Sequence, residues 1–116
     1  MTVALVGSRA RGDARSDSDI DIVIQCRRPE RYLNELTWIS QFGVVQAASI
    51  EDWGLVQSVR VFYADGPEVE YGITSSEWVR FPLDEGTIKV LRDGVLVLLD
   101  RDGALTRVVQ QVLDTK

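Results

Sequence analysis

The sequence predicts a domain of the mixed α/β (α+β) class, in which strands and helices are interspersed along the chain. Hydrophobic residues make up 45% of the 116 residues and charged residues 27%, which is typical of a globular chain with one core. Runs with the two-residue period of strands are separated by runs with the helical period, and Asp-Gly pairs mark turns between them. We therefore expect a single domain over residues 1–116.

The first half of the chain opens with two predicted strands. Residues 3–6 form a short apolar run, which predicts the first strand. Residues 8–17 are polar and suit a short helical stretch, for which Ser8 is a plausible N-cap. Residues 19–25 alternate strictly between isoleucines and other residues, which predicts the second strand. Residues 30–42 follow a proline and predict a helix.

The second half contains a hairpin pattern and two further helices. An Ala-Asp-Gly-Pro stretch separates two apolar alternating runs, as in a hairpin. The last helix has one apolar face, because its hydrophobic residues recur at helical spacing. The expected elements are a short strand over 44–48, hairpin strands over 55–63 and 68–74, a loop or single turn over 75–80, a helix over 84–92 capped by Asp84, a strand over 95–99 and a helix from Leu105.

Composition excludes several classes of protein. Cys26 is the only cysteine, and the absence of histidine excludes histidine-based triads and histidine-ligated zinc. The net charge of −5 gives no support for nonspecific nucleic-acid binding. The first apolar run is too short for a signal peptide, and no window approaches the roughly 20 apolar residues of a membrane span. These features favour a cytoplasmic protein whose chemistry depends on carboxylates, hydroxyls, basic side chains and bound metal.

The turn after the first predicted strand has features of a phosphate site. Gly7 permits close approach of the backbone to a ligand, and Ser8 adds a hydroxyl donor. Arg9 and Arg11 follow at once and provide positive charge. A lone Gly-Ser pair is usually only a turn, so this interpretation depends on the residues that follow it.

Those residues include two carboxylates on one face of the second predicted strand. Asp19 and Asp21 lie at i and i+2, so their Cα atoms are about 6.6 Å apart along one face of the strand. Carboxylate oxygens suit Mg²⁺, and two metal ions about 3.5–4 Å apart can stabilise attacking and leaving oxygens. An isolated Asp-x-Asp is usually a solvated strand face. In combination with Gly-Ser, however, it predicts a site for a nucleoside triphosphate and two Mg²⁺ ions, with Mn²⁺ as a substitute.

The segment GSRARGDARSDSDIDIVI resembles the signature of the DNA polymerase β nucleotidyltransferase superfamily, in particular its minimal nucleotidyltransferase branch. The family pattern is Gly-Ser, ten residues and Asp-x-Asp. The resemblance implies a nucleotidyltransferase-type mixed β-sheet with helices packed mainly on one face. It also implies that Gly7 and Ser8 hold phosphates and that Asp19 and Asp21 are catalytic residues that bind Mg²⁺.

Members of this family place a third carboxylate on a later strand, where it completes a metal site and helps deprotonate the attacking hydroxyl. Glu70 is the best candidate, because it lies on the strand face opposite Val69 and Tyr71. Glu68 shares that face and is the second candidate. Asp65 is assigned to the turn.

The resemblance implies transfer of a nucleoside monophosphate from an NTP, most simply ATP, to an acceptor hydroxyl with release of pyrophosphate. The acceptor is left open. It is a protein side chain in the antitoxin branch, which modifies a HEPN-type toxin, and a small molecule in the antibiotic-modifying branch. The alternative is a nucleotide-binding or antitoxin-type module that acts through a partner without useful catalysis.

Two further expectations concern the surroundings of the site. Family members usually carry a helix before the Gly-Ser strand, whereas here that strand begins almost at Met1, so a partner, a dimer or the last helix is expected to cover the exposed surface. Trp38, Trp53 and Trp78 are expected to pack in the core rather than stack on a base.

Overall fold

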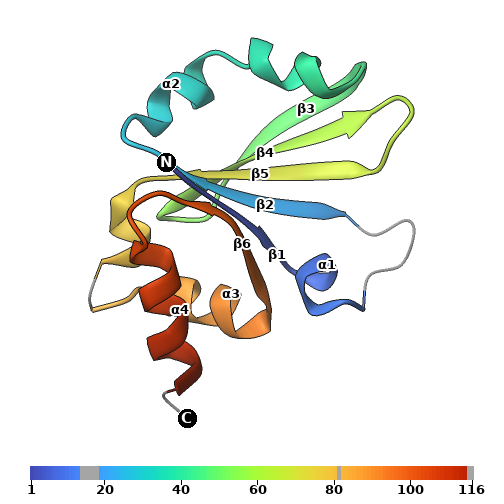
Figure 1. The fold of residues 1–116 in the computed structure, drawn as a ribbon. Helices are drawn as coiled ribbons and strands as arrows, with labels where there is room; N and C mark the ends of the chain where they lie inside the picture. Colours follow the sequence, from blue (N-terminus) through green and yellow to red (C-terminus); the bar gives the residue numbers. More distant parts are fainter. Residues whose placement is uncertain (14–18, 81, 115–116) are drawn as a thin grey trace.

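The computed structural model describes residues 1–13, 19–80 and 82–114, and in this part of the chain six strands form one mixed sheet with helices on both faces (Figure 1). The α+β class predicted from the sequence is confirmed. In chain order the elements are β1 (Thr2–Val6), α1 (Ser8–Arg11), β2 (Ile20–Gln25), α2 (Pro29–Asn34), the 3-10 helix η1 (Thr37–Phe42), β3 (Val45–Asp52), β4 (Val56–Tyr63), β5 (Glu68–Thr74), the 3-10 helix η2 (Ser76–Val79), α3 (Glu85–Asp93), β6 (Val95–Asp100) and α4 (Ala104–Asp114).

The strand order is β3-β4-β5-β2-β1-β6. The pair β2 and β5 is parallel, whereas the other neighbouring strands are antiparallel. The predicted hairpin is confirmed as β4 and β5. Because β5 returns beside β2, residues some fifty positions apart in sequence become cross-strand neighbours: Asp21 lies opposite Glu70.

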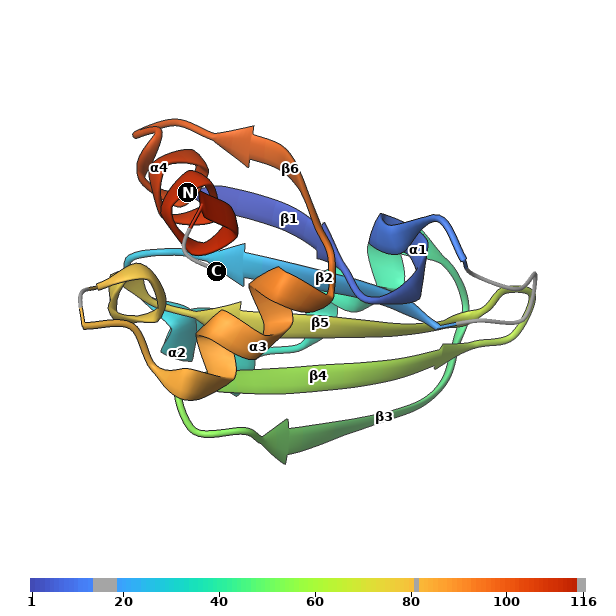
Figure 2. The same cartoon turned by 90° about the horizontal axis from the view of Figure 1, so that it is seen from below.

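The two longest helices, α3 and α4, pack on one face of the sheet, and Figure 2 shows both in front of it. Apolar residues of β1 and β2 meet these helices and η2 there. This first core consists of Ala4, Val6, Val23, Trp78, Val79, Leu91, Leu105, Val108 and Val112. The predicted apolar face of the last helix therefore lies in the core.

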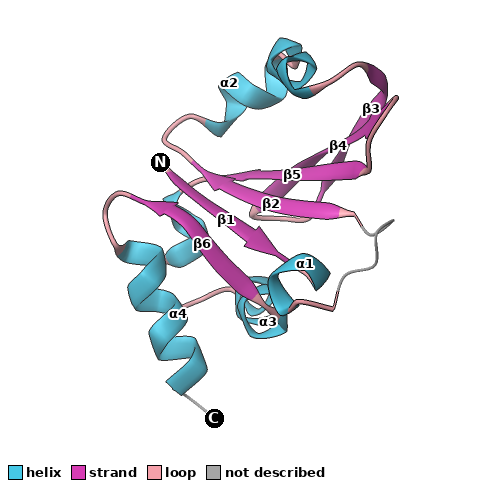
Figure 3. Cartoon of the chain, turned by 45° about the vertical axis from the view of Figure 1, so that its right-hand side comes forward, coloured by secondary structure: helices cyan, strands magenta, loops and turns pink. Residues whose placement is uncertain are grey.

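The opposite face of the sheet is covered by α2 and η1, and Figure 3 shows α2 on the side away from α3 and α4. The three isoleucines of β2 point to this side, which confirms the alternation predicted for residues 19–25. The second core consists of Ile39, Val59, Val61, Val69, Tyr71 and Ile73. Within it, the hydroxyls of Tyr63 and Tyr71 are 2.9 Å apart.

Two predicted helix features are wrong. The continuous helix over 30–42 is broken, because Glu35 adopts an extended conformation and η1 follows as a separate 3-10 helix. The indole of Trp38 donates a hydrogen bond of 3.0 Å to the carbonyl of Tyr32, which turns the chain back at the break. Ser8 is not the N-cap of α1: Gly7 takes that position and α1 begins at Ser8. The rest of the predicted polar segment, residues 14–17, lies outside the described residues.

No helix among the described residues is both long enough and apolar enough to cross a membrane.

Candidate active site

A row of side chains crosses the sheet on the face that carries α3 and α4. In the strand register, Val6 pairs with Asp21, Asp21 with Glu70, and Glu70 with Arg60. Successive positions in this row belong to β1, β2, β5 and β4, so four strands fix their relative placement. Directly paired residues on neighbouring strands have side chains in contact range. The sheet thus brings two predicted carboxylates together and adds an arginine.

Asp21 is the most constrained carboxylate of the row. Its Oδ1 atom is buried and has no hydrogen-bond partner among the described residues. Burial raises the pKa of Asp21 to about 6, and the hydrogen bond and negative charge of Glu70 and the charge of Asp19 act in the same direction, whereas Arg60 lowers it. Arg60 therefore compensates the ionised carboxylate only in part, and a bound cation would complete the compensation.

Arg60 is the centre of a carboxylate cluster. Its guanidinium lies 3.1 Å from Glu68, 3.6 Å from Glu70 and 3.9 Å from Asp19. It also donates a hydrogen bond from Nε to Glu51. Burial and a hydrogen bond with Asp19 raise the pKa of Glu68, which shows how closely the carboxylates are placed. One guanidinium thus contacts four carboxylates: one from β3, two from β5, and Asp19, the residue that precedes β2.

Two of the predicted Mg²⁺ ligands, Asp19 and Glu70, contact Arg60. In the described part of the chain, no three aspartate, glutamate, histidine or cysteine side chains form a ready-made metal site. Nevertheless the residues fit a divalent cation, because the donors are carboxylates and the buried Oδ1 of Asp21 has no partner. Asp19, Asp21 and Glu70 would be the ligands after Arg60 yields its contacts with Asp19 and Glu70.

Of the predicted phosphate-binding residues, Gly7 lies beside Asp21. Gly7 has φ of +76°, and a Cβ atom at this position would lie 2.6 Å from Oδ2 of Asp21, so only glycine fits here. Its carbonyl accepts hydrogen bonds from the backbone of Ala10 and Arg11, which fixes the single turn of α1. Ser8 begins this turn, and Arg9 is half-buried within it.

Arg11 makes contacts within the protein at the edge of the site. Its guanidinium donates a hydrogen bond of 3.1 Å to the carbonyl of Asp93 and forms an ion pair of 3.3 Å with Asp13. The hydrogen bond to Asp93 attaches α1 to the end of α3. The side chain still lines the cavity described next, so its predicted contact with a nucleotide is untested.

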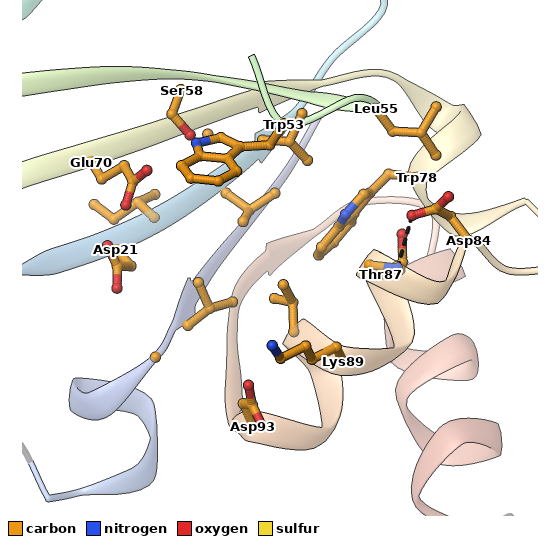
Figure 4. Close-up of a pocket in the computed structure, with 18 of the residues that line it drawn as sticks. Asp21, Trp53, Leu55, Ser58, Glu70, Trp78, Asp84, Thr87, Lys89 and Asp93 are labelled. Atoms are coloured by element: carbon orange, nitrogen blue, oxygen red, sulfur yellow. Dashed lines mark hydrogen bonds between the residues drawn. The ribbon is translucent and has the colours of Figure 1, made fainter. Parts of the chain in front are cut away.

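A cavity of about 450 Å³ extends from the two carboxylates toward α3. Figure 4 shows Asp21 and Glu70 at one end, the ring of Trp53 in the middle, and Trp78 and Thr87 toward the other end. Its volume is within the range of small-ligand sites. Gly7 also lines it, so the glycine turn and the carboxylates open into one space.

The expectation that all three tryptophans pack in the core is wrong for one of them. Trp78 is 2% exposed, and Trp38 packs edge-to-face on Tyr71 with ring centroids 4.9 Å apart. Trp53, in contrast, is 62% exposed, because the turn between β3 and β4 holds its ring over the cavity.

The sequence patterns did not indicate Arg60 as a residue of the site. The two-residue alternation of β4 places the Arg60 side chain on the face of the sheet opposite to that of Val59. The alternation cannot show that carboxylates of other strands lie beside Arg60, because that depends on the strand order.

Comparisons with known proteins identify the class of this domain. Residues 1–65 match the family model described as a nucleotidyltransferase domain, which is more than half of the chain. The chain belongs to this nucleotidyltransferase domain family. The matched segment contains Gly7, Ser8, Asp19 and Asp21 but ends before Glu70.

Among solved structures, a CCA-adding enzyme in complex with CTP matches with 20% identity and a TM-score of 0.44. The match covers 94% of this chain and 28% of that one, so the chain spans less than a third of the length of this enzyme. No curated protein matches the sequence.

Proposed function

We propose that this domain transfers a nucleoside monophosphate from a Mg²⁺-bound NTP, most simply ATP, to an acceptor hydroxyl and releases pyrophosphate. The observation that carries the proposal is the contact of Asp21 with both Gly7 and Glu70 at the mouth of one cavity. Membership of the nucleotidyltransferase domain family supports the same class of reaction.

In this proposal each residue has a separate task. The turn at Gly7 and Ser8 holds the phosphates against the start of α1, because the first backbone N–H groups of a helix have no intrahelical partner. Asp19 and Asp21 are the metal ligands and Glu70 is the third. Bound Mg²⁺ ions would neutralise the triphosphate and stabilise the attacking and leaving oxygens.

Bond changes at the α-phosphorus complete the proposed reaction. The acceptor oxygen forms a bond to the α-phosphorus while the bond from that atom to the oxygen bridging to the β-phosphorus breaks. Glu70 takes the proton of the acceptor hydroxyl, and the electron pair of the broken bond leaves with pyrophosphate. Positioning and charge stabilisation account for the catalysis.

The acceptor is proposed to be a hydroxyl brought by a partner, either a protein such as a HEPN-type toxin or a small molecule.

One observation favours a second candidate function, a nucleotide-binding or antitoxin-type module without catalysis. Arg60 already contacts four carboxylates, so the cluster holds one positive charge of its own without metal. Glu70→Gln separates the two functions, because an enzyme should lose turnover whereas a binding module should still engage its partner.

The test is calorimetric titration of the protein with a non-hydrolysable ATP analogue, with and without Mg²⁺. We expect binding that requires Mg²⁺ and is lost in Asp21→Asn and in Asp19→Asn. Each variant is a near-isostere, so thermal unfolding should confirm that the fold is retained. Binding that is equally strong without Mg²⁺, or in both variants, would contradict the proposal.

A further inference from the structure

The cavity beside the carboxylates has a second part that the proposed chemistry does not use. Asp21 and Glu70 occupy one row across the sheet, and the next row on the same face consists of Val23, Gly72 and Ser58, paired in register. All three line the cavity. The rows are two residues apart, hence about 6.6 Å. The second row is therefore within a nucleoside's reach of an α-phosphate held at the first.

The floor of this second part is kept open by small residues. A Cβ atom on Gly72 would lie 2.9 Å from the Val56 side chain and would project into the space above the sheet. Ser58 beside it is buried and is also small. A larger residue at either position would fill the floor. The sheet thus provides a flat and mainly apolar base for a planar group.

One wall of this space is the ring of Trp53. A tryptophan ring that is 62% exposed loses the stabilisation that burial of an aromatic side chain normally provides. The turn holds it there, because the backbone N–H of Trp53 donates a hydrogen bond of 2.9 Å to the carbonyl of Val56. Figure 4 shows the ring between the carboxylates and the α3 side of the pocket. A base that stacked on this ring would bury it.

The opposite wall is α3, and it carries an uncompensated polar group. Thr87 lines the cavity and is 1% exposed, yet its hydroxyl has no hydrogen-bond partner among the described residues. A buried hydroxyl without a partner is unfavourable and is rare in folded proteins. A ligand with a polar edge would supply the partner. Val90, also on α3, provides apolar contact beside it.

From these observations we infer that the part of the cavity bounded by Trp53, Gly72 and Thr87 is the nucleoside subsite, where the base of the transferred nucleotide stacks on the Trp53 ring. The inference rests on the proposed function, because it places the base relative to a triphosphate held at Gly7 and Asp21. It assigns recognition of the base to the turn between β3 and β4 and to α3. Stacking dominates such recognition, so it tolerates any base.

The experiment compares two probes, Mg²⁺-tripolyphosphate and a Mg²⁺-bound non-hydrolysable ATP analogue, by calorimetry and by tryptophan fluorescence. We expect the analogue to bind at least about tenfold more tightly than tripolyphosphate, because a stacked base contributes on the order of one factor of ten or more. Trp53→Ala should remove most of this difference and leave tripolyphosphate binding unchanged. Trp53→Phe should keep the affinity but lose most of the fluorescence change on binding.

The matched control is Phe42→Ala, which removes another exposed aromatic ring that does not line the cavity. It should change neither affinity. If tripolyphosphate binds but Trp53→Ala has the affinity of the wild type for the analogue, the inference is overturned and the proposed function is retained. If neither probe binds in a manner that depends on Asp21, the proposed function fails and the inference with it.

Thr87→Val provides an independent readout, because valine keeps the shape of threonine without the hydroxyl. We expect the ligand-free variant to melt at a higher temperature than the wild type and to bind the analogue several-fold more weakly. A lower melting temperature together with unchanged affinity would show that the hydroxyl has a structural partner, and would remove α3 from the subsite.

Discussion

The backbone of Gly7 lies so close to Asp21 that a single added methyl group would overlap the carboxylate, with 2.6 Å between the added Cβ and Oδ2. The Gly-Ser turn after β1 and the Asp-x-Asp motif on β2 are therefore packed directly against each other. The antiparallel register of β1 and β2 explains this contact, because it pairs Val6 directly with Asp21.

This contact predicts the effect of Gly7→Ala. The positive φ of +76° is strained for alanine, which should destabilise the protein by about 1–2 kcal/mol. The added Cβ should also displace the Asp21 carboxylate and abolish Mg²⁺-dependent nucleotide binding. Urea denaturation measures the first effect and calorimetry the second.

Gly12→Ala is the matched control. Gly12 has a similar φ of +81°, but a Cβ there would meet nothing within 4 Å. Gly12 has ψ of 13° and lies in the left-handed helical region, whereas Gly7 has ψ of −154°, a conformation almost confined to glycine. Gly7→Ala should therefore lose more stability than Gly12→Ala, and only Gly7→Ala should lose binding. Equal loss of binding in both variants would show that strain in α1, and not the contact with Asp21, is responsible.

Arg60→Gln should destabilise the metal-free protein, because the variant leaves four carboxylates without their shared cation. We expect a loss of about 1–2 kcal/mol, between the values for exposed and for buried ion pairs. Added Mg²⁺ should restore stability to the variant more than to the wild type. Arg80→Gln, which removes an exposed arginine outside this cluster, serves as the control for net charge. Urea denaturation at several Mg²⁺ concentrations gives the comparison.

Sequence patterns were sufficient for the parts of this site that depend on local order. The alternation of residues 19–25 placed Asp19 and Asp21 opposite the isoleucines, and the alternation of 68–74 placed Glu70 opposite Val69 and Tyr71. Both predictions depend on two-residue periodicity alone, and the structure agrees with them. The strands of the predicted hairpin were also correct to within one residue.

The remaining features depend on contacts that periodicity cannot specify. Arg60 joins the carboxylates only because β4 pairs with β5, and β5 with β2. Trp53 was assigned to the core on the basis of its residue type, but the turn holds its ring outside both cores. The prediction of one helix over 30–42 was wrong. The indole of Trp38 donates a hydrogen bond to the carbonyl of Tyr32, which would otherwise accept a backbone hydrogen bond in a continuous helix.

The choice of third carboxylate can be tested with two matched variants, Glu70→Gln and Glu68→Gln. Both carboxylates contact Arg60, so both variants lose one ion pair of the same type. Only Glu70 pairs in register with Asp21 and lines the cavity. We therefore expect Glu70→Gln to weaken Mn²⁺ binding in the presence of the ATP analogue at least about tenfold, and Glu68→Gln to have little effect. The reverse order would assign the third position to Glu68.

Asp100 predicts a pH-dependent contribution to stability outside the site. Although burial acts to raise its pKa, the backbone N–H and hydroxyl of Thr106, each 2.8 Å away, lower the pKa below its ordinary value. The stabilisation is thus fully present above the unfolded pKa of about 4 and is lost as the pH falls through the folded pKa. Asp100→Ala should lose about 1 kcal/mol at pH 7, because these bonds cap the start of α4. The difference from the wild type, measured by urea denaturation, should shrink toward pH 3.

Asp21→Asn should have opposite effects on stability without and with metal. The pKa of Asp21 rises from 3.8 to about 6 on folding, because burial and the charges of Glu70 and Asp19 outweigh the effect of Arg60. The folded protein therefore binds more protons than the unfolded chain between these values, and its stability falls as the pH rises through that window. An asparagine does not titrate and can donate a hydrogen bond to Glu70. In the absence of metal the variant should be more stable than the wild type above pH 6, by about 1 kcal/mol once solvent screening is allowed for.

This advantage should disappear toward pH 4, where the wild-type carboxyl is protonated in the folded and, increasingly, in the unfolded state. With saturating Mg²⁺ and the ATP analogue the order should invert, because only the wild type gains stability from ligand binding. Thermal unfolding of the wild type and of Asp21→Asn, each with and without Mg²⁺ and the ATP analogue, gives the four stabilities to be compared at each pH. A variant that is less stable than the wild type at pH 7 without metal would show that the ionised Asp21 is already compensated in the fold. The argument for a cation at this position would then fail.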